Sequence, residues 1–148
     1  MFYIYVVFSR YIMHHSYLRI TNITLLGSIV YFCAFSQKLL RDYILAFLLV
    51  LAVITSQLFW INPKRGTVIH RIDSFIAKFV IGSFIIYTLT HKLNTIILLI
   101  SYWLLLTGIA ISFYYSSYYS TRKWCSRKHI RSHAWLHILC FVATLYAF

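Results

Sequence analysis

Residues 131–148 read RSHAWLHILCFVATLYAF, and this stretch decides how the rest of the chain is interpreted. It follows a run of Lys and Arg, carries His133 and His137 near its start, and is apolar from there to its end. Residues four apart lie on one face of an α-helix. We therefore expect a helix that enters a membrane with two stacked imidazoles at its mouth.

The composition of the whole chain is that of a membrane protein. Of its 148 residues, 61% are hydrophobic and only 11% are charged, whereas a soluble domain carries about a quarter charged residues. Several apolar runs approach the ~20 residues that a helix needs to cross the hydrocarbon layer. The sequence predicts one all-α domain over residues 1–148, a polytopic transmembrane helix bundle of four to five spans.

An interfacial arm and five membrane spans are predicted along the chain. Residues 1–20 mix aromatic and basic side chains and are interpreted as an N-terminal arm that lies at the membrane interface. The expected spans lie at about 22–37, 43–61, 68–89, 95–115 and 132–148. The first of these is the shortest apolar run, and without it four spans remain.

The basic residues predict an orientation in the membrane. With five crossings, ten Lys and Arg fall on one side and three on the other, while Lys78 stays within a span. Cytoplasmic loops collect Lys and Arg, so the N-terminus is expected in the cytoplasm and the C-terminus outside it. The endoplasmic reticulum or another internal membrane is the expected location. If residues 23–35 do not cross, only the N-terminal arm changes side.

This topology brings five polar residues to one side of the membrane. They lie near the cytoplasmic ends of three predicted spans and are Ser56, His70, Asp73, His133 and His137. An ionisable group inside a membrane costs about 2.5–3.5 kcal/mol on insertion, so such groups usually face a partner or a water-filled cavity. We expect these five side chains to share one site.

The chemistry of this set is that of a catalytic zinc site. Three neutral imidazoles and one water complete the tetrahedron that catalytic zinc adopts, so His70, His133 and His137 are the expected ligands. Asp73 can take a proton from the zinc-bound water, and Ser56 can support the oxyanion that forms.

Two alternatives to this ligand set stay open. His129 lies four residues before His133 and is a rival third ligand, although the loop around it is strongly basic. The imidazoles can also be ordinary interfacial side chains, because an amphipathic ring suits a helix mouth. In that case His70 and Asp73 form a local pair.

The residues also support a family resemblance. The segment HAWLHILCFVATLY, at 133–146, resembles the final helix of the alkaline ceramidases, which belong with the adiponectin and progestin receptors to the CREST group of membrane hydrolases. That group carries a Ser and a His on one helix, an Asp on the next, and two His four apart on the last. Ser56 and Asp73 match the first two helices, and His133 and His137 match the last.

The chain departs from the CREST pattern at two points. The first His of that group follows its Ser by four residues, and this position is Trp60 here, so His70 would have to take its place from the next helix. The group also has three spans between the Asp helix and the final helix, and here only residues 95–115 intervene. Three spans and one span are both odd numbers of crossings, so the final helix still enters the membrane from the side where Asp73 lies.

The resemblance implies a zinc-dependent intramembrane hydrolase of a lipid amide or ester, similar to a ceramidase, with zinc-bound water as the nucleophile. The alternative is a non-enzymatic multi-span membrane protein, structural or a partner subunit, whose basic loop from Arg122 to Arg131 contacts anionic lipid headgroups. A haem protein is disfavoured, because neighbours four apart on one helix cannot face each other across the ring. The charge of +12 follows the predicted topology, so a nucleic-acid partner is not expected.

Overall fold

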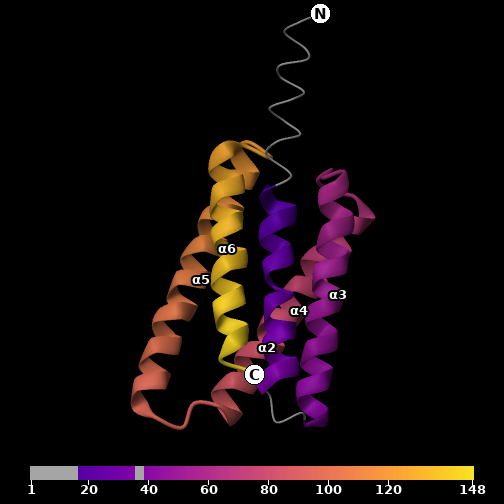
Figure 1. Cartoon of the computed structure of the whole chain (residues 1–148). Coiled ribbons are helices and arrows are strands. Elements are labelled where there is room, and N and C mark those ends of the chain that lie inside the picture. The colour runs from indigo at the N-terminus through magenta and orange to yellow at the C-terminus, as the bar shows by residue number, and fades with distance from the viewer. Residues whose placement is uncertain (1–16, 36–38) are drawn as a thin grey trace, which may run out of the picture.

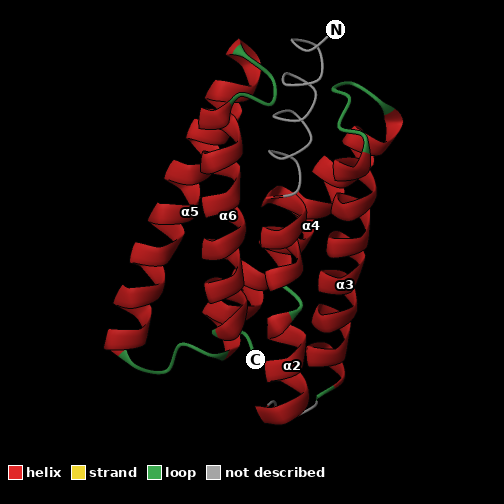
Figure 2. Cartoon of the chain, turned by 45° about the horizontal axis from the view of Figure 1, so that its top comes forward, coloured by secondary structure: helices red, strands yellow, loops and turns green. Residues whose placement is uncertain are grey.

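A computed structural model describes residues 17–35 and 39–148 of the chain, and this part is a bundle of antiparallel helices (Figures 1 and 2). Residues 17–24 are helical and lead through a short turn into the next helix. The helices that follow are α2 (Gly27–Phe35), α3 (Leu40–Ile61), α4 (Val68–His91), α5 (Ile96–Arg122) and α6 (Arg127–Leu145). The predicted all-α bundle is confirmed. Residues 1–16, most of the predicted interfacial arm, lie outside the described residues.

The chain is an integral membrane protein. Within the described residues, four segments are long and apolar enough to cross a membrane, namely Tyr17–Phe35, Leu40–Ile61, Val68–His91 and Ile96–Arg122. Many large apolar side chains on these segments face outward, where hydrocarbon would surround them. Helix α6 has 19 residues and packs along α5, in the reverse direction, from a basic first turn.

Helix ends are set by local sequence. Pro63 follows the end of α3, where its ring prevents the helix from continuing. The Thr67 hydroxyl then caps α4 by accepting a hydrogen bond from the backbone N–H of His70 at 3.4 Å. Thr95 and Ser126 cap α5 and α6 in the same way.

Two helices extend beyond their predicted ends. Helix α5 continues to Arg122, whereas the sequence predicted an end at Tyr115, and α6 begins at Arg127. The hydroxyls of the intervening segment explain the difference, since Ser120 and Thr121 donate to backbone carbonyls three residues earlier in the same helix. Their side chains are satisfied without leaving the helix, so a polar composition does not end it.

The helices form two antiparallel hairpins, α3–α4 and α5–α6, with α2 between them (Figure 1). In the first hairpin Leu49 and Val53 of α3 belong to one apolar cluster with Phe84 of α4. In the second, Leu136 of α6 packs in a cluster with Tyr102 of α5. Because most helix contacts are made within a hairpin, the space between the hairpins is where a cavity can form.

The basic residues gather at one end of the bundle, where α3 turns into α4 and α5 turns into α6 (Figure 1). Among the described residues this end carries Arg19, Lys64, Arg65, Arg71, Arg122, Lys123, Arg127, Lys128 and Arg131, while the opposite end carries Arg41 and Lys92. We call the first of these the basic end.

Candidate functional site

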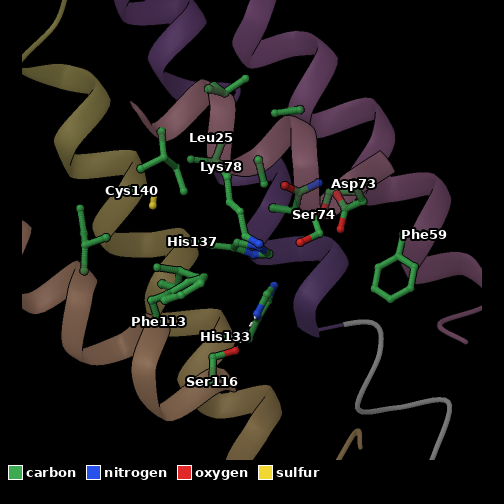
Figure 3. Close-up of a pocket in the computed structure, with 18 of the residues that line it drawn as sticks. Leu25, Phe59, Asp73, Ser74, Lys78, Phe113, Ser116, His133, His137 and Cys140 are labelled. Carbon is green, nitrogen blue, oxygen red and sulfur yellow. Dashed lines mark hydrogen bonds between the residues drawn. The ribbon is translucent and has the colours of Figure 1, made fainter. Parts of the chain in front are cut away.

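A cavity of about 310 Å³ lies between the two hairpins, and all five predicted site residues line it. Figure 3 labels Asp73, His133 and His137 among them. Most of its wall is apolar, including Leu49 and Phe84 on the hairpin α3–α4 and Ile109 and Leu136 on the hairpin α5–α6. Cavities of this size and character take small ligands with an apolar part.

Ser56 and Asp73 meet across the hairpin α3–α4. Ser56 is five residues before the end of α3 and Asp73 is five residues after the start of α4, so both lie about 7.5 Å from the basic end at 1.5 Å per residue. The Ser56 side chain is buried, and it lines the cavity together with the Asp73 carboxylate, with which it interacts. The structure therefore brings together the expected general base and the expected supporting hydroxyl.

His133 and His137 lie edge to face on the cavity side of α6, with their ring centroids 4.8 Å apart. The Nδ1 atom of His133 is 2.9 Å from the Ser116 hydroxyl, and that of His137 is 3.0 Å from the Thr21 hydroxyl. These contacts fix both rings through their Nδ1 atoms, so that within residues 17–35 and 39–148 the two Nε2 atoms are the ring nitrogens left for a ligand. Metal-binding His residues usually hold their other ring nitrogen in a hydrogen bond, most often to a carboxylate, a backbone carbonyl or a water.

His70 lies in the same cavity but nearer to the basic end. It is only two residues into α4, whereas His133 and His137 are six and ten residues into α6. Its Nδ1 atom accepts a hydrogen bond from the Gly66 N–H at 3.3 Å, and its ring packs against Phe59. His70, the predicted third ligand, is thus held by a hydrogen bond to the turn that precedes α4.

The alternative third ligand, His129, is also engaged locally. Its Nδ1 atom accepts from the Cys125 N–H at 3.3 Å, and its ring centroid is 5.8 Å from that of His133. In residues 17–35 and 39–148, no three side chains of His, Cys, Asp and Glu lie together so that they could hold one metal ion. Two imidazoles fit the ligand role for zinc, and none of the described residues supplies a third ligand beside them.

Trp60 stands where the CREST group has its first His. Its ring packs edge-on against His133, with the centroids 5.3 Å apart. The position one turn after Ser56 therefore does face the two terminal imidazoles, and here it supplies a large buried apolar ring in place of a nitrogen ligand.

The sequence patterns predicted no role for Lys78. It is ten residues into α4, as His137 is into α6, so both lie about 15 Å from the basic end. Its side chain lines the cavity and reaches toward His137 (Figure 3). A lysine this deep in an apolar helix was itself a signal, because such residues usually face a cavity or a partner.

Sequence reasoning also missed the two hydroxyls that orient the imidazoles. Ser116 lies in a stretch that was predicted to leave the helix, and Thr21 lies next to the predicted interfacial arm. Only the packing of α5 and the N-terminal helix against α6 brings them to His133 and His137.

No family model matches the chain, and comparisons with curated proteins and with solved structures found no match either. The resemblance to the CREST group therefore rests on Ser56, Asp73, His133 and His137 and on the sequence around the last two.

Proposed function

We propose that this chain is an intramembrane hydrolase that cleaves the amide or ester bond of a membrane lipid, with zinc as its cofactor. The observation that carries the proposal is the shared cavity, where Ser56 and Asp73 face the cavity from one hairpin and His133 and His137 from the other. Its apolar wall suits an acyl chain, and the polar groups near the basic end suit the bond that is cleaved.

Asp73 acts first as general base. It removes a proton from the water that attacks the carbonyl carbon, and the carbonyl oxygen becomes an oxyanion. The Ser56 hydroxyl, released from the now protonated Asp73, donates to this oxyanion, and the Lys78 ammonium offsets its charge. When the intermediate collapses, the C–N or C–O bond breaks and Asp73 returns the proton to the leaving nitrogen or oxygen. The products are a fatty acid and an amine or alcohol.

His133 and His137 would hold zinc through their Nε2 atoms, since hydroxyls occupy both Nδ1 atoms. Bound zinc supplies a water that ionises near neutral pH. In the part of the chain that the structure describes, no third ligand lies beside these imidazoles, and the proton transfers proposed here involve only the chain's own side chains.

Metal analysis tests the zinc assignment. Purified wild-type protein is expected to carry about one zinc per chain, and His133→Ala and His137→Ala are expected to lose it, because each removes one of the two imidazoles proposed to hold the ion. His91→Ala is the matched control, since His91 lies at the far end of α4 and does not line the cavity. Wild-type protein without stoichiometric zinc would end the zinc part of the proposal.

The second candidate is a non-enzymatic membrane protein, structural or a partner subunit. Among the described residues no third ligand accompanies His133 and His137, and this favours the second candidate. Purified protein in nanodiscs, offered lipids with amide-linked and ester-linked acyl chains, decides between the two. Release of fatty acid that depends on Asp73 supports the hydrolase, and no release from any lipid of the panel supports the second candidate.

We propose that the basic end faces the cytoplasm, in the endoplasmic reticulum or another internal membrane. The unequal distribution of Lys and Arg between the two ends supports this orientation. In sealed microsomes, with the native cysteines replaced, Lys123→Cys is expected to react with a membrane-impermeant maleimide. Lys92→Cys, at the opposite end, should react only after detergent is added. The reverse labelling pattern would invert the proposed orientation.

A further inference from the structure

The turn between α5 and α6 forms a second hollow, separate from the cavity that holds the candidate site. Four cations and two aromatic rings line it, namely Arg122, Lys123, Arg127 and Lys128 with Tyr118 and Tyr119. The proposed hydrolysis uses none of these residues.

Two of the cations are held in place by the tyrosines. The Arg122 guanidinium lies 4.5 Å from the ring centroid of Tyr118, and the Lys128 ammonium lies 5.8 Å from that of Tyr119. Cation–π contacts of this kind restrict long side chains without neutralising them. The charges therefore remain available to an anion.

The chain supplies no acid to this hollow. It contains only two carboxylate side chains, Asp42 at the start of α3 and Asp73 in the cavity, and neither lines the hollow. Lys123 and Arg127 are four residues apart across the turn, and like charges at close spacing repel each other. The cluster is stabilised only if an anion comes from outside the chain.

The backbone of the turn also favours the binding of an anion. Helix α6 begins here, and N–H groups at the start of a helix favour negative charge. The turn itself is fixed, because the Trp124 ring N–H donates to the Pro63 carbonyl at 3.0 Å and the Cys125 N–H donates to His129. The cations are thus displayed from a rigid turn that is tied to the α3–α4 turn.

The position of the hollow relative to the membrane indicates which anion it binds. Helix α5 has 27 residues and is about 40 Å long, whereas the hydrocarbon core is about 30 Å thick, so a helix spanning it ends in the headgroup layer. Tyrosines near its end, such as Tyr118 and Tyr119, are typical of this layer. We propose that the hollow binds the phosphate group of an anionic phospholipid from the leaflet at the basic end.

Native mass spectrometry of the full chain, released from mixed micelles of phosphatidate and phosphatidylcholine, tests this site. Wild-type protein is expected to retain more phosphatidate than phosphatidylcholine. The double variant Arg122→Gln/Lys128→Gln should lose about 30-fold of that preference, as expected for two cations removed from the headgroup layer. The matched control is Arg41→Gln/Lys92→Gln, which removes the same charge at the opposite end, where both cations lie over the Tyr87 ring. The control should keep the preference.

Three outcomes would overturn the proposal. Equal losses in the two double variants would mean that net charge alone attracts the lipid, and an unchanged preference in Arg122→Gln/Lys128→Gln would mean that the hollow is not the site. Loss of bound phosphatidate from the wild type in 10 mM inorganic phosphate would show a site for free phosphate instead. If the first variant does not fold, Lys123→Gln/Arg127→Gln replaces it. None of these measurements depends on hydrolysis, so this proposal and the proposed function fail independently.

Discussion

Asp73→Asn is expected to lower the rate of lipid hydrolysis by a factor of about 10² to 10⁴, the usual contribution of a general base. Asparagine has nearly the same shape, and its amide oxygen can still interact with the Ser56 hydroxyl. The fold should therefore persist while the proton acceptor is lost. The measurement is fatty acid release by purified protein in nanodiscs, together with its zinc content.

Comparison with other variants separates the roles within the site. Asp73→Asn should keep its zinc, whereas His133→Ala should lose both zinc and activity. Ser56→Ala removes one donor to the oxyanion and should lower the rate by about 10². Ser83→Ala is its control, because that hydroxyl bonds to the Phe79 carbonyl within α4 and does not line the cavity. Full activity in Asp73→Asn would place the general base elsewhere.

The arrangement of the helices could be predicted from the sequence for two reasons. The length of each apolar run predicts a helix, and the number of spans between two helices, odd or even, decides whether they start on the same side. Long apolar runs predict helices, and the asparagine–proline pair at 62–63 ends one of them. Helices that alternate in direction must bring the end of α3 and the starts of α4 and α6 to the same side. Counting residues from that side then predicts that Ser56 and Asp73 lie at one depth, as they do.

The rotation and local contacts of each helix could not be predicted in the same way. His70 was expected beside His133 and His137, but its nitrogen bonds to the Gly66 backbone only a turn away. The bond between His70 and Gly66 joins residues in the same turn, so it forms without any particular packing of distant helices. Contacts between helices, such as Thr21 with His137, depend on packing that no spacing in the sequence specifies.

The two acids of the chain are expected to have opposite roles. Asp42 is fully buried at the start of α3, far from the basic end. One of its oxygens accepts from the Leu39 N–H at 3.1 Å, and the other accepts from the Tyr87 hydroxyl near the end of α4. Asp42 therefore ties together the two ends of the first hairpin, whereas Asp73 serves the cavity.

Asp42→Ala is accordingly expected to lower the free energy of unfolding by about 3 kcal/mol, because hydrogen bonds to a buried charge contribute about 1.5–3 kcal/mol each. For a chain of this size the thermal midpoint should fall by about 6–12 °C, measured by intrinsic fluorescence in detergent. Tyr87→Phe should cause about half of this loss, and it replaces Asp42→Ala if that variant does not fold. Tyr114→Phe is the control, since Tyr114 is 62% exposed.

A double-mutant cycle between Asp42 and Tyr87 isolates their hydrogen bond from the other effects of each substitution. The losses should be less than additive, because the second substitution removes a bond that the first has already broken. Folded Asp42→Ala protein should hydrolyse lipid at the wild-type rate, since neither Asp42 nor Tyr87 lines the cavity. Unchanged midpoints in both single variants would contradict the structural role. A normal midpoint with lost hydrolysis in Asp42→Ala would instead mean that the two acids act in one site.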